Sequence, residues 1–110
     1  MKTIADFKRR LKVGCYVHTI FHQYAVGRDE NGKLILGDQD LGIRRVSVVQ
    51  SNSFAFETVT SKGDLVDSWI AYPKKTDTKF IDENTITIFT PDFRVHDESV
   101  LIPCLTYKFL

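Results

Sequence analysis

The amino-acid sequence predicts a mainly β domain: a partly closed antiparallel barrel or curled sheet of about eight short strands, with one short N-terminal helix. Three observations support this fold class. Successive segments alternate apolar and polar residues and are rich in β-branched and aromatic side chains, as in residues 44–50, 54–59, 66–72, 85–90 and 105–109. Turn-forming residues separate these segments. Helical spacing of apolar residues occurs near the start of the chain alone, and a sheet without flanking helices tends to curl or close.

The helix is predicted over residues 4–12. Thr3 and Asp6 have the spacing of a capping box, with an acidic residue in place of the usual Glu or Gln. Gly14 is placed to end the helix. Three apolar residues share one helical face: Ile4, Phe7 and Leu11. Because so short a helix is marginal in isolation, it must pack on the sheet to exist.

The first strand is predicted over residues 15–23. Asn31-Gly32 is a strong signal for a type I′ turn, which makes residues 34–36 the returning strand of a hairpin. The composition of residues 37–42 predicts a loop. Later in the chain, a turn at 82–84 predicts a second hairpin, and residues 91–100 form a loop before the terminal strand.

Length and composition predict a single domain over residues 1–110, with the helix at about 4–12 and the β region at about 15–110. The net charge is +1, but residues 1–12 carry five basic residues and one acidic residue, a net of +4, so the remainder sums to −3. A strongly basic nucleic-acid-binding domain would usually show more positive charge than this.

The chain is expected to be cytoplasmic. Its N-terminal residues lack the apolar run of a signal peptide, and no segment approaches the length of a membrane span. The two cysteines, Cys15 and Cys104, are therefore expected to be reduced thiols.

Three segments carry a resemblance to known proteins: IADFKRRLKVG at residues 4–14, DSWIAYPKK at 67–75 and LTYKF at 105–109. They resemble small uncharacterised single-domain proteins of bacterial phages and integrative mobile elements. The resemblance implies a mobile-element origin and transfers no activity and no site residue. The segment VGCYV at residues 13–17 is also similar to the first strand of SH3-like barrels, which implies a small barrel of that kind.

No catalytic, cofactor or metal motif is recognisable, so the sequence predicts a non-catalytic protein without a cofactor. His18 and His22 are four residues apart on a strand, roughly 13 Å, which is too far to share one metal ion. Cys15 and His18 fall on opposite faces of that strand and cannot form a dyad. A meeting of Cys104 with a histidine such as His96 elsewhere in the fold stays open.

Two acidic segments give weaker signals for chemistry. Asp38, Asp40 and Gly42 suggest part of a calcium loop, but the glycine is one position early and the bidentate Glu is missing. Asp97 and Glu98 could supply one half of a carboxylate pair, although adjacent acidic residues in a loop are usually solvated.

The leading functional hypothesis is a protein-interaction module. The mobile-element resemblance suggests a more specific form of it, a modulator or inhibitor of a host protein. Aromatic residues are enriched where proteins bind one another. The candidate binding residues combine aromatic anchors with a strand-ending proline and two lysines: Trp69, Tyr72, Pro73, Lys74 and Lys75. Trp69 shares its strand face with Asp67 and Ala71, so partial exposure of the indole is expected.

The alternative hypothesis is a small nucleic-acid-binding barrel. Its candidate phosphate-contacting residues lie on the basic helix and at the start of one strand: Lys8, Arg9, Lys12, Arg44 and Arg45. Aromatic residues on neighbouring strands, notably Phe54, Phe56 and Trp69, could then stack on bases. The simpler interpretation is a solvated helix face above a phenylalanine-rich core.

Overall fold

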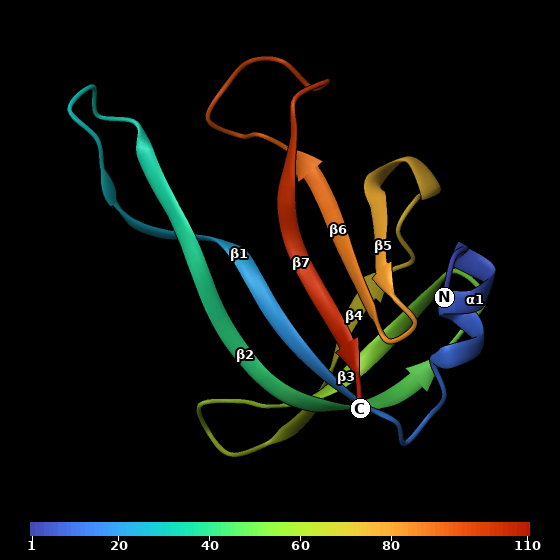
Figure 1. Ribbon diagram of the computed structural model, residues 1–110. Coiled ribbons are helices and arrows are strands. Elements are labelled where there is room, and N and C mark those ends of the chain that lie inside the picture. The colour runs from blue at the N-terminus through green and yellow to red at the C-terminus, as the bar shows by residue number, and fades with distance from the viewer.

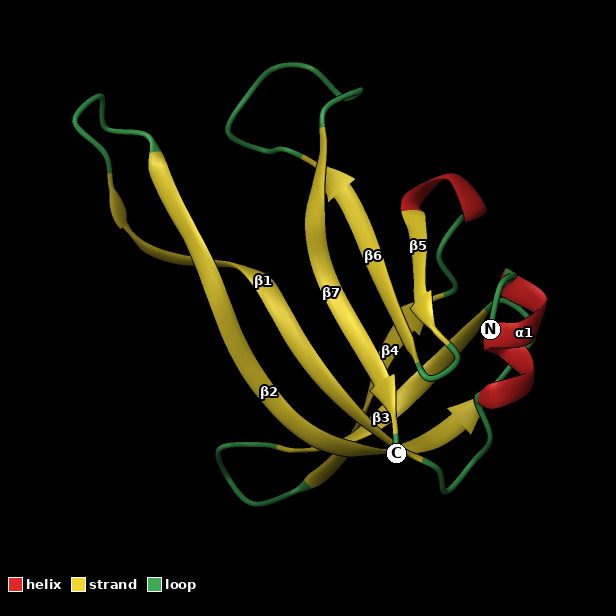
Figure 2. Ribbon diagram, in the orientation of Figure 1, coloured by secondary structure: helices red, strands yellow, loops and turns green.

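A computed structural model describes residues 1–110 and shows one antiparallel sheet of seven strands with one α-helix (Figures 1 and 2). The helix is α1 (Ile4–Arg10), and a single 3₁₀ turn, η1 (Lys75–Asp77), precedes the fifth strand. The strands are β1 (Tyr16–Arg28), β2 (Leu34–Val49), β3 (Ser53–Val59), β4 (Leu65–Ala71), β5 (Thr78–Asp82), β6 (Thr85–Pro91) and β7 (Leu101–Phe109).

The prediction of a mainly β fold with one short helix is confirmed, but the sheet does not close. Its strand order is β4-β3-β2-β1-β7-β6-β5, so β4 and β5 each have one side without a neighbouring strand. The sheet is strongly bent, and the β1–β2 hairpin projects well beyond the other strands (Figure 1). The architecture is therefore a curled open sheet.

The predicted loop over residues 37–42 is wrong, because β2 runs through it without a break. The segments 34–36 and 44–50 thus belong to one strand, which gives seven strands where about eight were expected. Three register shifts in the β1–β2 ladder allow residues that are typical of loops to lie within the strand. One of them leaves Leu41 without an opposite residue, and Gly42 beside it has a φ of 78°, a conformation that favours glycine.

The turn of this hairpin also differs from the predicted type I′. That type needs positive φ at both central residues, yet Asn31 keeps a negative φ and Gly32 has a φ of 78°. The N–H of Gly32 donates to the carbonyl of Asp29, and the Asp29 side chain accepts from the N–H groups of Asn31 and Lys33. Hydrogen bonds to Asp29 therefore stabilise this turn, which is not of type I′.

The other predicted elements agree with the structure more closely. β3 and β4 begin within one residue of the expected positions, and the β5–β6 hairpin is present. β1 and β7 extend further than expected, by pairing with each other and with β2 and β6. The capping box is confirmed: Thr3 accepts from the N–H of Asp6, and Asp6 accepts from that of Thr3.

The core lies on the concave side of the sheet, beneath α1. Phe7 of the helix is fully buried, with ring centroids 5.8 Å from Phe54 and Phe109 and 6.3 Å from Tyr72 and Tyr107. These partners come from β3, β7 and the segment after β4, so one helical side chain joins distant parts of the sheet. The buried cluster comprises Phe7, Leu11, Val17, Val46, Phe54, Phe56, Ile86, Tyr107 and Phe109.

Replacement of Phe7 by alanine should lower the free energy of unfolding by about 3–5 kcal/mol, because it leaves a cavity among the aromatic rings that Phe7 contacts. Urea unfolding followed by circular dichroism measures the loss. Val13→Ala is the matched control, since Val13 is 58% exposed and should change the stability by less than about 0.5 kcal/mol. Equal effects of the two substitutions would show that α1 is not part of the core.

The capping carboxylate of Asp6 should make stability depend on pH in the acidic range. Its pKa is lowered below 3.8 by the backbone N–H of Lys2, with further bonds from Thr3 and Arg9. A lowered pKa in the folded state gives a stabilisation that is complete above 3.8 and is lost as the pH falls through the folded-state pKa.

Asp6→Ala should therefore be less stable than the parent protein at neutral pH, with a difference that shrinks in acid. The measurement is urea unfolding of both proteins at pH 7 and well below pH 3.8. Glu98→Ala is the control, because the exposed Glu98 accepts no hydrogen bond in the folded protein. A difference between parent and Asp6→Ala that stays constant in acid would argue against a role of the ionised carboxylate.

Candidate functional site

The outer edge of β4 is a free hydrogen-bonding edge. The ladder between β3 and β4 has no register shift, and it is bracketed by bonds from the N–H of Thr60 to Asp64 and from the N–H of Tyr72 to Asn52. Antiparallel pairs alternate between bonded and non-bonded. Even-numbered residues of β4 therefore bond to β3, and the main-chain groups of the odd-numbered ones point away from the sheet: Leu65, Asp67, Trp69 and Ala71.

The side chains of these four residues share the outer, convex face of the sheet, and all four are exposed. Leu65 is 64% and Trp69 48% exposed, and they flank Asp67, whose carboxylate accepts a hydrogen bond from Ser47. Val66 is also exposed, although it belongs to the opposite face. The strand thus offers unpaired main-chain groups together with exposed apolar side chains. We call Leu65–Ala71 with its free side the β4 edge.

The opposite edge of the sheet is shorter and less regular. β5 has five residues, one register irregularity and an exposed lysine, Lys79, all of which discourage the addition of a further strand. The N-terminal residues Met1 and Lys2 share a surface pocket with this strand. Of the two edges, β4 is the longer one and has no register irregularity, and Asp67 is the one charged residue along it.

The predicted protein-binding residues do not form one surface. Trp69 lies on the convex face, whereas Tyr72 turns toward the core, where its ring centroid is 5.4 Å from that of Phe54. Pro73 is half-buried, and Lys74 and Lys75 are exposed at the entrance to η1. The expectation that Trp69 is partly exposed agrees with the structure.

The predicted phosphate-contacting residues are also dispersed. Arg45 forms an ion pair with Glu57 at 3.2 Å, while Arg44 points to the concave face and lies over the ring of Phe56. Lys8 lies over the ring of Tyr72, with its Nζ 4.6 Å from the centroid, and Lys12 is exposed.

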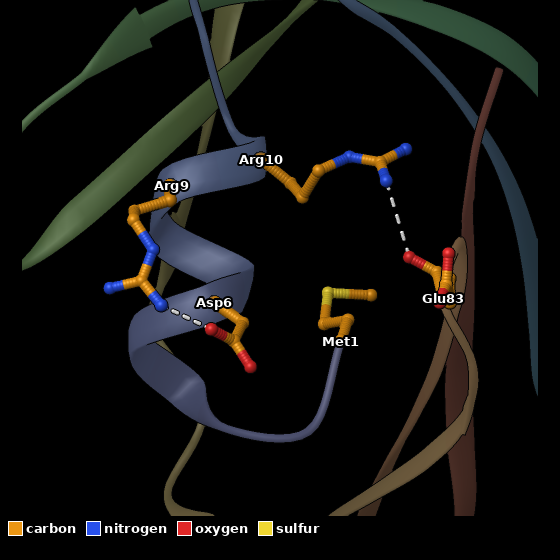
Figure 3. Close-up of a pocket in the computed structure, with 5 residues that line it drawn as sticks. All are labelled: Met1, Asp6, Arg9, Arg10 and Glu83. Atoms are coloured by element: carbon orange, nitrogen blue, oxygen red, sulfur yellow. Dashed lines mark hydrogen bonds and ion pairs between the residues drawn. The ribbon is translucent and has the colours of Figure 1, made fainter.

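Two arginines of α1 bind other groups of the same protein, around a surface pocket next to the β5–β6 turn (Figure 3). Arg9 pairs with Asp6 within the helix. Arg10 donates to the main-chain carbonyl of Glu83 and to the side chain of Asn84, and it also lies over the ring of Phe109. The basic helix is therefore bound to the sheet through its charges as well as through Phe7.

A polar network on the convex face was not expected from the sequence. His22 Nδ1 lies 2.7 Å from Asp38 Oδ1, and its Nε2 lies 2.6 Å from Thr106 Oγ1, which is 2.8 Å from Thr87 Oγ1. The carboxylate–imidazole–hydroxyl order is that of a proton relay. However, β7 is paired on both sides around Thr106, so no pair of free N–H groups is left there to stabilise an oxyanion. The network cross-links four strands.

The other histidine and cysteine positions show no catalytic arrangement. His18 Nε2 lies 2.7 Å from Asp40 Oδ1, and the pKa of Asp40 is lowered by the N–H of Gly42 and by His18. Cys15 and Cys104 are free thiols, burial raises the pKa of Cys104, and neither thiol is hydrogen-bonded to a histidine. No three metal-ligating side chains gather anywhere in the protein.

Comparison with protein-family models, with curated proteins and with solved structures gives no match. No helix of the protein combines the length and the apolar character that a membrane crossing needs.

The network at His22 gives a prediction about its protonation. Because a carboxylate can only accept, Nδ1 of His22 must carry a hydrogen toward Asp38, and in the neutral ring Nε2 accepts from Thr106. Long-range ¹H–¹⁵N correlation spectra, recorded where the ring is neutral, should show the Nδ1–H form. Asp38→Ala should release this preference, and an Nε2–H form in the parent protein would contradict the assignment.

Proposed function

We propose that this protein is a non-catalytic protein-interaction module that binds an extended segment of a partner protein along the β4 edge. The observation that carries the proposal is the set of outward main-chain groups on Leu65, Asp67, Trp69 and Ala71. An extended peptide adds to such an edge as a further strand, with affinity from main-chain hydrogen bonds and specificity from alternate side chains.

Side chains beside the edge define the kind of segment that would fit. Leu65 and Trp69 are exposed apolar residues on the same face, and Asp67 lies between them. Cross-strand neighbours on one face interact directly. A partner strand with apolar residues opposite Leu65 and Trp69, and a polar or basic residue near Asp67, would therefore pair best.

Support for the nucleic-acid alternative is weaker. Arg44 and Arg45 point to opposite faces, Arg45 is neutralised by Glu57, and Arg9 and Arg10 have partners within the protein. Lys8 and Lys12 remain, which is less than the continuous basic surface that phosphate binding usually needs. A salt-sensitive affinity for DNA or RNA that is lost on Lys8→Glu with Lys12→Glu would favour this alternative.

The test selects peptides from a random display library on the immobilised protein and compares their affinities for three variants. Asp67→Pro removes an outward N–H without touching the β3 ladder, and Asp67→Ala removes the side chain alone. The selected peptides should bind Asp67→Pro at least about tenfold more weakly than Asp67→Ala, because a main-chain bond is lost. Trp69→Ala should weaken binding through the side-chain contact.

Ser68→Pro is the control for the direction of the main-chain groups. Ser68 bonds to β3, so this variant should lose stability, whereas Asp67→Pro should stay folded by circular dichroism. Selection of no peptide, or equal affinity of the selected peptides for Asp67→Pro and Asp67→Ala, would contradict the proposed function.

A further inference from the structure

Four buried side-chain polar atoms of the protein have no hydrogen-bond partner: Thr19 Oγ1, Arg44 Nε, Thr58 Oγ1 and Tyr107 OH. They come from β1, β2, β3 and β7. A buried polar atom without a partner is uncommon and costly, so such atoms call for an explanation. Here, every atom of this kind falls in one region of the fold.

The registers of the ladders place the four side chains next to one another on the concave face. Thr19 is directly opposite Tyr107, and Arg44 is opposite Val17, two residues from Thr19 on the same face. On β3, Phe56 is opposite Val46 of β2. Thr58 comes two residues after Phe56, and Arg44 comes two residues before Val46, so the antiparallel strands bring Thr58 to the level of Arg44. Residues with this spacing share a face of the sheet.

Arg44 is the charged member of this group. Its guanidinium carbon lies 4.5 Å from the centroid of the Phe56 ring, and no carboxylate lies within ion-pairing distance. Three other arginines pair with carboxylates, Arg9 with Asp6, Arg45 with Glu57 and Arg94 with Asp92, and the remaining two, Arg10 and Arg28, donate to main-chain carbonyls. Burial lowers the pKa of Arg44, as expected for a positive charge that is half removed from water without a counter-charge.

Tyr107 and Thr19 are the fully buried residues of this group of four. Tyr107 is 1% and Thr19 0% exposed, and Tyr107 belongs to the buried apolar cluster. Burial raises the pKa of the Tyr107 phenol, and the nearby charge of Arg44 opposes this rise. The phenol therefore stays protonated at neutral pH and is available as a hydrogen-bond donor, as are the two threonine hydroxyls.

We propose that Arg44, Tyr107, Thr19 and Thr58 form a binding site for a small oxyanion, a phosphate or a carboxylate group, on the concave face of the sheet. The guanidinium is held by stacking alone, so its side chain can rotate to bring its N–H groups and the hydroxyl donors to one ligand. A guanidinium fork matches the oxygens of a carboxylate or a phosphate, and the hydroxyls donate to the remaining oxygens.

This site is independent of the proposed function at the β4 edge. Leu65, Asp67, Trp69 and Ala71 project from the convex face, whereas Arg44 and Tyr107 project from the concave face. A ligand could therefore occupy either site without the other. Failure of one proposal leaves the other in place.

The test follows the Nε–Hε resonances of the arginines by ¹H–¹⁵N NMR during titration with inorganic phosphate and, separately, with acetate. We expect a saturable shift of the Arg44 resonance with one or both anions, and the comparison of the two identifies the preferred group. Arg45→Gln is the matched control, because Arg45 is the adjacent residue on the opposite face. This variant should bind as the parent does, and Arg44→Gln should not bind.

Tyr107→Phe and Thr19→Val test the buried donors while keeping their volume. Each removes a hydroxyl that has no partner in the free protein, so folding should be retained, and each should weaken anion binding by about tenfold. Equal, non-saturating shifts at Arg44 and Arg45 would overturn the proposal. So would unchanged affinity in Tyr107→Phe and Thr19→Val, because the anion would then contact the Arg44 guanidinium alone.

Discussion

The burial of Phe7 in the concave face of an unclosed sheet is the interaction on which the rest of the structure depends. A curled sheet that does not close leaves its concave side open to water, and an element from outside the sheet must cover it. The seven-residue helix α1 is too short to be stable alone, so helix and sheet stabilise each other. Arg10 and Lys8 reinforce this docking by stacking on Phe109 and Tyr72.

The same helix explains why the two edges of the sheet differ. The N-terminal residues that precede α1 lie near β5, and Arg10 holds the β5–β6 turn through Glu83 and Asn84. β4 receives no comparable cover on its outer side. An open sheet with one short, irregular edge and one longer, regular edge has a preferred place for strand addition, which is the physical basis of the proposed interaction.

Local patterns of the sequence were sufficient to predict the helix with its capping box, β3, β4 and the late hairpin. The continuity of β2 could not be predicted, because Gly37, Asp38, Asp40 and Gly42 have the composition of a loop. Their place in a strand follows from bulges that form only when β1 is alongside. Long-range pairing therefore overrode a local signal.

The two proposed binding features could be predicted from local sequence patterns even less well than the fold. Trp69 could be recognised as partly exposed from its polar strand face, but the freedom of the β4 edge depends on the strand order of the whole sheet. The gathering of Thr19, Arg44, Thr58 and Tyr107 depends on three ladders at once. Arg44 and Arg45 are adjacent in sequence, and only the alternation of a strand shows that one is paired on the convex face and the other unpaired on the concave face.

The most direct test of the account is amide hydrogen exchange along β4 in the free protein. The open edge predicts an alternating pattern, in which Val66, Ser68 and Ile70 exchange slowly and Leu65, Asp67, Trp69 and Ala71 exchange rapidly. Uniform slow exchange along the whole strand would contradict the account, since it would mean that the outward groups are already paired and that the β4 edge is not free.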